Sequence, residues 1–317
     1  MELTREEADC VDQFVKYLRI PTVHPNPNYE PAIDLLCHLC SAIEGIKCTI
    51  IELAPKNPFL IATLTGKYPK KESLMLSGHM DVAPVHRPSW TVDPFEAKIV
   101  NGEIYARGSQ DMKCITIMQI NALKRLIAGG FVPNRTIHLV MSPDEVVGSA
   151  RGMELFINSD YFKNLNVGFV MDEGIASPTE LMPLFYGERA LCSLIITCAG
   201  NAGHGSQFIS NTAAEKLHRI FTEFQRFRDQ EEKRLKEDPK LKLGDVTTVN
   251  VTMAEKEIFP AFTDSRLIRR AGHQCVGFSP IHNTKILMHD NDERLRIDVF
   301  LRGIQIYERI IEELLSI

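Results

Sequence analysis

Residues 136–149 have the sequence TIHLVMSPDEVVGS, an apolar run of strand length that ends on two acids and then returns at once to valine. A continuous apolar run of this kind predicts a strand that is buried on both faces, as in a parallel sheet. Acids are common at solvated strand ends, but α/β proteins also keep their functional groups at the carboxyl edge of such a sheet. The groups that the rest of the chain brings to that edge decide between these interpretations.

Strands and helices alternate on either side of this run. Apolar strands are predicted around SLMLSGH (residues 73–79) and VGFVMDE (167–173), and apolar residues at helical spacing predict helices at 4–19, 32–44 and 111–126. This alternation predicts an α/β fold with a mostly parallel sheet and flanking helices.

The character of the chain changes after about Arg189. Strands are predicted over LCSLIITCAG (191–200) and VTTVNVTM (246–253), and between them a long charged helix begins where Thr212 and Glu215 fit a capping box. This stretch is an inserted α+β domain.

The chain then returns to short loops and apolar strands, and a last helix is predicted from about Asp292. We therefore expect one large domain formed by residues 1–188 and 258–317. A smaller domain, residues 189–257, interrupts it.

Composition argues against several classes of partner. The chain of 317 residues carries a net charge of −5 and has no basic cluster interleaved with aromatic residues, so nucleic acid is not an expected partner. No apolar run approaches the ~20 residues of a membrane span, and the acidic N-terminus lacks a signal-peptide core. Eight scattered cysteines favour reduced thiols and the cytosol. Cys37 and Cys40 form a lone CxxC pair at helical apolar spacing, which favours core packing over zinc binding.

Metal-type ligands recur where strands end or helices begin. Taken alone, each would be an ordinary surface group or helix cap. Several such groups at one edge of a sheet indicate a metal site, because imidazole and carboxylate together suit zinc, and two zinc ions can share a bridging carboxylate. The candidates are His79, Asp81, Asp111, Glu145, Asp172, Glu173 and His289.

Six ordered motifs carry a resemblance to a known family: SGHMDVAPV (77–85), WTVDPFEAKIVNGEIYARGSQDMK (90–113), SPDE (142–145), MDEGIASP (171–178), GNAGHGS (200–206) and HDNDERL (289–295). They resemble the co-catalytic zinc metallopeptidases, most closely the animal aminoacylases, across nearly the whole chain. The resemblance implies a zinc-peptidase-like domain with an inserted lid, zinc-dependent hydrolysis of N-acyl-L-amino acids to a carboxylate and a free amino acid, two Zn²⁺ per subunit, and a homodimer.

The resemblance also implies metal ligands. His79 and Glu173 would hold one zinc ion, His289 would serve the other, and Asp111 would bridge both. Asp81 would accept a hydrogen bond from the ring of His79 and thereby fix its tautomer.

Three further residues receive roles from the resemblance. Glu145 would act as the general base that takes a proton from the metal-activated water and passes it to the leaving amine. His204 would reach from the lid of one subunit into the site of its partner and stabilise the oxyanion. Arg266 would hold the carboxylate of the substrate.

One residue departs from the family pattern. The family places a second glutamate after Pro-Asp-Glu, where it ligates the second zinc ion, but this chain has Val146 there. A full site would balance two zinc ions with three carboxylates and a hydroxide, and here one carboxylate is missing. We therefore expect weak binding of the second ion unless Asp144 or Glu145 takes the vacant place.

The lid departs from the family pattern as well. After VTTVNVTM (246–253) the family continues with a glycine-rich turn, an Asn-Val-x-Pro motif and further strands, whereas this chain passes almost directly to TDSR (263–266). A truncated lid would leave strand edges unpaired and would weaken the dimer and the reach of His204. The alternative function is therefore a catalytically impaired or inactive homologue with a binding or regulatory role.

Overall fold

The computed structural model of the chain describes residues 3–187, 194, 196–241, 245–249 and 263–316. The chain divides into two compact units. Residues 1–188 and 261–317 form what we call the main unit, and residues 189–260 form the inserted unit.

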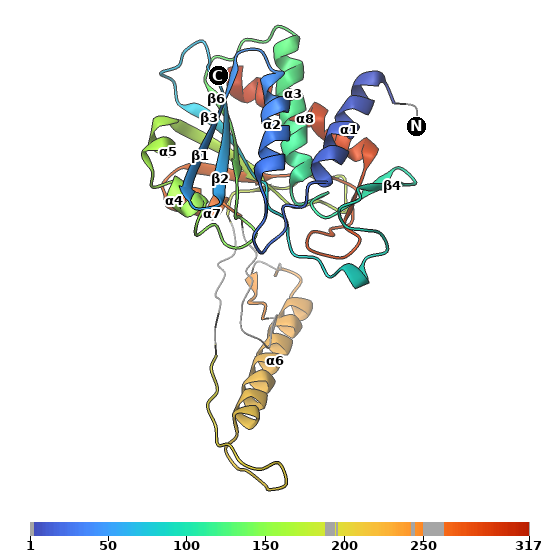
Figure 1. Cartoon of the computed structure of the whole chain (residues 1–317), viewed down its shortest axis with the longest axis vertical. Coiled ribbons are helices and arrows are strands. Elements are labelled where there is room, and N and C mark those ends of the chain that lie inside the picture. Colours follow the sequence, from blue (N-terminus) through green and yellow to red (C-terminus); the bar gives the residue numbers. More distant parts are fainter. Residues whose placement is uncertain (1–2, 188–193, 195, 242–244, 250–262, 317) are drawn as a thin grey trace. The chain divides into compact units, whose positions relative to one another are not determined.

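The main unit is built on a seven-stranded sheet with the order β1-β2-β6-β3-β7-β9-β8 (Figure 1). The four central strands β6, β3, β7 and β9 run parallel, while β2 pairs antiparallel with both β1 and β6, and β8 pairs antiparallel with β9. This confirms the predicted α/β fold with a mainly parallel central sheet. The strands are β1 (Ile46–Ala54), β2 (Asn57–Leu64), β3 (Ser73–His79), β6 (Ile137–Ser142), β7 (Val167–Glu173), β8 (Leu184–Phe185) and β9 (Gln274–Phe278).

Helices cover both faces of this sheet, which explains why its strands are continuous apolar runs. Successive residues of β6 alternate between the two resulting cores: Leu139 and Met141 belong to one apolar cluster and Val140 belongs to the other. The first cluster includes side chains of α1 (Arg5–Leu18), α2 (Glu30–Ser41), α3 (Lys113–Ala128) and α8 (Ile297–Ser316). The second includes side chains of α4 (Met153–Phe156), α5 (Asp160–Asn164) and α7 (Ser265–Arg270).

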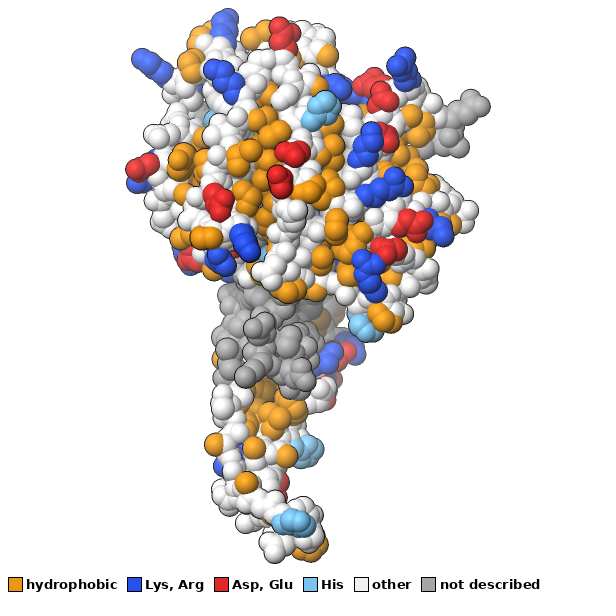
Figure 2. All heavy atoms as spheres, viewed as in Figure 1, with side chains coloured by type: hydrophobic (Ala, Val, Ile, Leu, Met, Phe, Trp, Pro, Cys, Tyr) orange, Lys and Arg blue, Asp and Glu red, His pale blue; other side chains and the backbone are white. Residues whose placement is uncertain are grey.

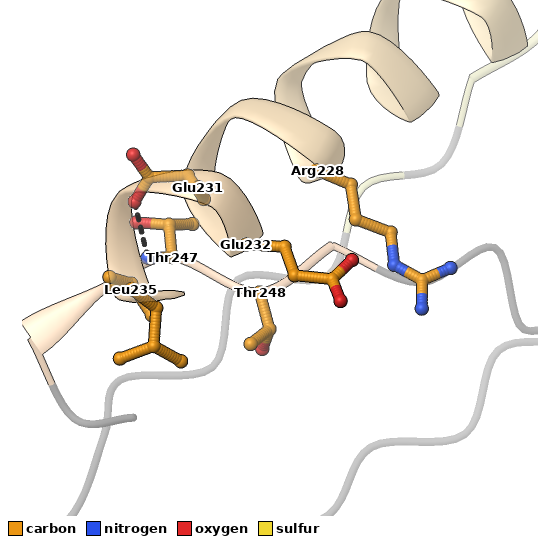
Figure 3. Close-up of a pocket in the computed structure, with 7 residues that line it drawn as sticks. Arg228, Glu231, Glu232, Leu235, Thr247 and Thr248 are labelled. Atoms are coloured by element: carbon orange, nitrogen blue, oxygen red, sulfur yellow. Dashed lines mark hydrogen bonds between the residues drawn. The ribbon is translucent and has the colours of Figure 1, made fainter. Parts of the chain in front are cut away.

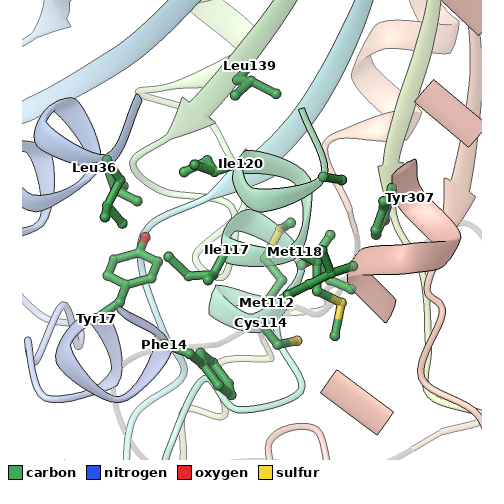
Figure 4. Packing of buried hydrophobic residues seen from close by; sticks show 14 of the residues in the cluster. Phe14, Tyr17, Leu36, Met112, Cys114, Ile117, Met118, Ile120, Leu139 and Tyr307 are labelled. Atoms are coloured by element: carbon green, nitrogen blue, oxygen red, sulfur yellow. The ribbon is translucent and has the colours of Figure 1, made fainter. Parts of the chain in front are cut away.

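The first cluster is centred on α3, which is buried along most of its length (Figure 4). Gly303 lets α8 approach α3 closely, because a Cβ atom at that position would lie 2.5 Å from Met118 Sδ. Phe14 of α1 stacks on Phe300 of α8 with ring centroids 4.5 Å apart. These contacts hold α3, and with it the turn that precedes its first residue, in a fixed position.

The last helix begins later than the sequence predicts. Residues Arg294–Arg296 form strand β10, which pairs with β5 (Glu103–Tyr105) in a small sheet that also contains β4 (Lys98–Val100). Because this pairing holds the backbone extended, α8 starts at Ile297 rather than near Asp292. A short 3-10 helix, η1 (Arg87–Ser89), precedes the small sheet in the chain.

The described part of the inserted unit contains one helix, α6 (Ala213–Glu237), capped by Thr212 and Glu215 as predicted. A hollow of roughly 160 Å³ lies between the later turns of α6 and residues 246–248 (Figure 3). The two strands predicted at 191–200 and 246–253 lie partly outside the described residues, and no strand forms at residues 194, 196–200 or 246–249. A strand needs a neighbour for its N–H and C=O groups, and the described part of the inserted unit contains no strand that could be one.

The surface of the main unit in Figure 2 carries Lys and Arg side chains interspersed with Asp and Glu. None of the helices searched among the described residues is long and apolar enough to cross a membrane.

Candidate metal centre

Three neighbouring strands deliver candidate ligands to the carboxyl edge of the sheet. His79 is the last residue of β3 and lies opposite Ser142, the last residue of β6, so that Glu145 follows within one turn. Glu173 ends β7 on the other side of β3. Ligand atoms of His79, Glu145 and Glu173 lie within 4.8 Å of one another, and all three side chains are buried. Parallel strands thus bring together groups that are far apart in the chain.

Asp111 lies between two imidazole rings. One oxygen, Oδ1, is 3.0 Å from His79 Nε2, and the other, Oδ2, is 2.8 Å from His289 Nε2. Asp111 precedes α3, while His289 comes from the loop that follows β9. A carboxylate with one oxygen toward each histidine has the arrangement that a ligand shared by two ions requires.

Asp81 connects the centre to the backbone around it. Its side-chain oxygens lie 2.9 Å from His24 Nε2 and 3.3 Å from His79 Nδ1, and they accept hydrogen bonds from the backbone N–H groups of Glu145 and Val146. Burial alone would raise the pKa of Asp81, but hydrogen bonds with His24 and His79 outweigh burial and lower it. The ring of His79 is therefore oriented by the Asp81 backbone carbonyl oxygen, 2.8 Å from Nδ1, together with the ionised carboxylate, which also holds the turn that carries Glu145.

The buried carboxyl groups of the centre outnumber the positively charged groups around them. Burial, reinforced by neighbouring carboxylates, raises the pKa of Glu145 and that of Glu173 well above their usual values. Burial lowers the pKa of His79, but Glu145, Asp111 and Asp81 together raise it well above normal. Among the described residues, Glu145 Oε1 and Glu173 Oε2 have no hydrogen-bond partner. Buried, unpaired carboxylate oxygens beside imidazole nitrogens fit a divalent metal ion.

A comparison with models of protein families matches residues 75–313 to "Peptidase family M20/M25/M40". The chain belongs to this family. Curated relatives agree: aminoacylase-1A of Rattus norvegicus is 36% identical over 394 positions, which cover 98% of this chain and 96% of the relative. Aminoacylase-1 of Dictyostelium discoideum is 33% identical over 404 positions, covering 98% of each. The resemblance to aminoacylases is confirmed.

Solved structures of M20 peptidases have the same fold. Human carnosine dipeptidase 1 superposes with a TM-score of 0.69 at 12% identity, covering 98% of this chain and 97% of that chain. An M20 family metallo-carboxypeptidase from Sulfolobus solfataricus gives 0.62 at 15% identity, with 98% and 99% covered. A dinuclear metal-binding M20 peptidase of Bacillus subtilis gives 0.58 at 12% identity, with 98% and 99% covered.

The alignment lengths show that this member of the M20 family is short. The alignment with the rat relative is 394 positions long and covers nearly the whole of both sequences, so at least 77 of its positions have no residue in this chain of 317. Residues are therefore missing from this chain relative to that aminoacylase.

Val146 and Asp144 bear on the second ion. Val146 is buried and contributes its backbone N–H to Asp81. The Asp144 carboxylate accepts a hydrogen bond from Arg151 N at 2.8 Å, and a Cβ atom on Gly152 would collide with its Oδ1. One oxygen of Asp144, Oδ2, is thus held by the backbone of the next turn, while Oδ1 has no hydrogen-bond partner among the described residues.

The remaining predicted residues lie outside this group. Arg266 belongs to α7, and its Nη2 donates to the carbonyl oxygen of Gly148 at 3.1 Å, just after the turn of Glu145. His204 lies in the inserted unit, exposed, with its Nδ1 2.8 Å from Ser206 Oγ. Their assigned roles stay predictions.

The sequence analysis did not identify Glu293 and His24 as residues that support the centre. Glu293 accepts hydrogen bonds from the backbone N–H groups of Gly108, Gln110 and Asp111 and pairs with the buried Arg107 at 2.7 Å. It therefore fixes the turn that carries Asp111, and its position within HDNDE was the only signal in the sequence. His24 lies in a loop rich in proline and asparagine, and nothing local indicates that it reaches Asp81.

Asp264, also missed, lies behind the Glu145 turn. Its two oxygens accept hydrogen bonds from the hydroxyl groups of Ser142 and Ser149. Burial, with a further contribution from Asp172, raises the pKa of Asp264 to about 7. Asp172 in turn accepts a hydrogen bond from Ser265 at 2.7 Å.

Replacing His24 tests whether it supports the centre through Asp81. We expect His24→Leu to weaken the binding of an added divalent metal ion roughly 10–100-fold, as loss of a group behind a ligand does. His24→Gln keeps an N–H donor and should restore most of the affinity, measured by competition with a chelator. His86→Leu, at an exposed position, is the control. Wild-type affinity in a folded His24→Leu protein would refute the role.

The raised pKa of Asp264 leads to a prediction about how the stability of the protein depends on pH. Its pKa of about 7 in the folded state exceeds the ~3.9 of an unfolded chain, so the folded state binds the extra proton and stability falls as pH rises from about 4 to 7. Asp264→Asn should therefore increase the free energy of unfolding of the chelator-treated protein at pH 8 by roughly 1–4 kcal/mol, and far less at pH 5. Urea titrations at both pH values measure this, with exposed Asp12→Asn as the control. An equal increase in the free energy of unfolding at both pH values would contradict the raised pKa of Asp264.

Proposed function

We propose that this chain hydrolyses the amide bond of N-acyl-L-amino acids, releasing a carboxylate and a free amino acid, with zinc at the centre described above. Its relatives named aminoacylase-1 support the substrate class. The observation that carries the proposal is the buried Glu145 carboxylate, whose Oε1 is unpaired beside His79 and Glu173.

Four residues of the centre would serve as the zinc ligands. His79 and Glu173 would hold one zinc ion, His289 the other, and Asp111 would bridge them. A bound zinc ion would polarise the scissile carbonyl and acidify water. Imidazole and carboxylate ligands favour zinc over the harder cations, which take oxygen ligands.

Glu145 accepts the proton of the attacking water and donates it to the leaving nitrogen. Burial raises the pKa of Glu145 above its usual value, which is the direction that favours a carboxyl group that both accepts and returns a proton. Asp81 keeps Glu145 in place through the backbone N–H of that residue, at 3.2 Å. The catalytic group and the His79 ligand therefore share one support.

Substrate recognition falls to groups outside the buried centre. We assign Arg266 to the carboxylate of the substrate and His204, from the partner subunit of a homodimer, to the oxyanion. Arg266 is already tied to the segment that follows Glu145 through the Gly148 carbonyl, which supports its assignment. Dimerisation and a cytosolic location stay predictions from the sequence.

A second candidate function rests on Val146. A buried isopropyl group stands where the family pattern has a ligand, and Asp144 is held by the backbone near Arg151. A chain that keeps only one ion firmly would be an impaired homologue with a binding or regulatory role. The number of bound ions separates the two functions.

Removing the base tests the mechanism. Glu145→Gln keeps the size of the side chain but cannot take a proton, so kcat on N-acetyl amino acids should fall roughly 10²–10⁴-fold. Zinc content should stay within measurement error of the wild type, which separates loss of the base from loss of a ligand. Exposed Glu313→Gln on α8 is the control and should keep full activity. Loss of zinc from Glu145→Gln would make Glu145 a ligand instead.

Restoring the missing ligand tests the second site. After dialysis at low zinc concentration, we expect about one zinc ion per wild-type chain and about two in Val146→Glu, counted by elemental analysis. Val147→Glu adds the same charge at the adjacent, exposed position and should not change the count. Two ions in the wild type would show that another group replaces the glutamate. Turnover confined to Val146→Glu would favour the impaired homologue.

A further inference from the structure

His289 lies in a loop that has no regular structure of its own. Residues 279–293, which connect β9 to β10, form neither helix nor strand. Within them His289 is the third residue of a β-turn, in which the Asp290 N–H donates to the Leu287 carbonyl oxygen at 2.9 Å. The φ angle of His289 is 61°, in the left-handed region that favours glycine or asparagine at this turn position. Contacts from other parts of the chain therefore hold the turn.

The side chain of Gln110 makes three hydrogen bonds to the backbone around this turn. Its Nε2 donates to the carbonyl oxygens of Lys285 at 3.0 Å and Arg294 at 2.9 Å, and its Oε1 accepts from the N–H of Leu287 at 2.9 Å. Gln110 is buried, with 4% of its surface exposed, and its amide nitrogen uses both of its hydrogens. It therefore holds the loop at Lys285, at the first residue of the turn, and again where β10 begins.

The last residue of the turn is held from the same segment of the chain. Arg107 Nη1 donates to the carbonyl oxygen of Asp290 at 3.1 Å and pairs with the Glu293 carboxylate at 2.7 Å. Glu293 belongs to the loop, and it accepts a hydrogen bond from the backbone N–H of Gln110. The segment before α3 and the loop are thus joined in both directions, through side chains from each that bond to the backbone of the other.

These contacts act on different members of the candidate centre. Glu293 accepts from the backbone N–H of Asp111 and so places that residue. Gln110 bonds instead to the backbone on either side of His289. Asp111 follows Gln110 in the chain, and its Oδ2 lies 2.8 Å from His289 Nε2. Two consecutive residues therefore hold one histidine, Gln110 through the backbone around it and Asp111 through its ring.

We propose that Gln110 is a positioning residue for His289. It acts through the loop backbone and fixes the place from which the imidazole ring of His289 reaches Asp111. Loss of its three hydrogen bonds would free the turn from its left-handed backbone conformation and move the ring away from Asp111. The inference rests on the proposed function in one respect, since it takes His289 to be the ligand of the second zinc ion.

The sequence makes the reactivity of His289 easy to measure. Trypsin cleaves after Lys285 and Arg294, so peptide 286–294 contains His289 as its single histidine, and peptide 190–216 contains only His204. The full chain, treated with a chelator, is exposed to diethyl pyrocarbonate, which acylates imidazole nitrogen, and the modified fraction of each peptide is measured by mass spectrometry. His204 belongs to the inserted unit and serves as the internal reference.

Gln110→Met keeps the length of the side chain but cannot donate a hydrogen bond and accepts one only weakly. We expect acylation of His289, relative to His204, to rise roughly 10-fold in this variant, because the lost hydrogen bonds favour the opened loop. Gln110→Glu keeps an acceptor for the Leu287 N–H and should lie between Gln110→Met and the wild type. Gln119→Met, at another buried glutamine, is the matched control and should leave His289 unchanged. Wild-type reactivity in a folded Gln110→Met protein, or an equal rise in Gln119→Met, would overturn the inference.

Zinc counts separate this inference from the proposed function. In the Val146→Glu background, where two ions are expected, Gln110→Met should lose one ion after dialysis at low zinc concentration, and Gln119→Met should keep both. The acylation experiment decides the inference by itself, because it uses chelator-treated protein. Increased acylation of His289 in a chain that binds no zinc would support the role of Gln110 and contradict the proposed function. Unchanged acylation in a chain that binds two ions would overturn the role of Gln110 and leave the proposed function standing.

Discussion

The carboxylate of Asp81 is the interaction on which the rest of the centre depends. It contacts His79, His24 and the backbone N–H groups of Glu145 and Val146, so three separate segments of the chain depend on one buried charge. A buried carboxylate is costly unless it is hydrogen-bonded, and here every contact that satisfies it also places a functional group. Positioning of His79, the candidate metal ligand, and positioning of Glu145, the proposed base, are thus a single constraint.

Much of the fold and of the candidate site could be predicted because strand ends carry their own signal. The apolar runs around residues 73–79, 136–142 and 167–173 identify buried parallel strands, and parallel strands share a carboxyl edge. Asp81 and Glu145 could be placed there from the sequence alone, since each follows such a run. Asp111 and His289 were also candidates from their places in the sequence, and the resemblance to the family supplied the roles predicted for them.

The rest could not be predicted because it depends on contacts between distant segments. His24 precedes Asp81 by 57 residues, and Glu293 is 182 residues from the Asp111 N–H that it accepts. Neither lies in a periodic stretch that would indicate its partner. Over their described residues, the strands expected at 191–200 and 246–253 do not form for a related reason, because local β propensity cannot supply a missing neighbour.

The order of these segments in the chain has a consequence for biosynthesis. His289, Glu293 and strand β9 all come after the inserted unit, yet β9 lies next to β7, and Glu293 fixes the turn of Asp111. A nascent chain that has produced everything up to the insertion therefore exposes the free edge of β7 and holds a cluster of acids without the second histidine. The pairing of His289 with Asp111 is complete only after the segment that contains β9 and His289 has been synthesised and β9 has paired with β7. The inserted unit, whatever else it does, sets the delay between these two events.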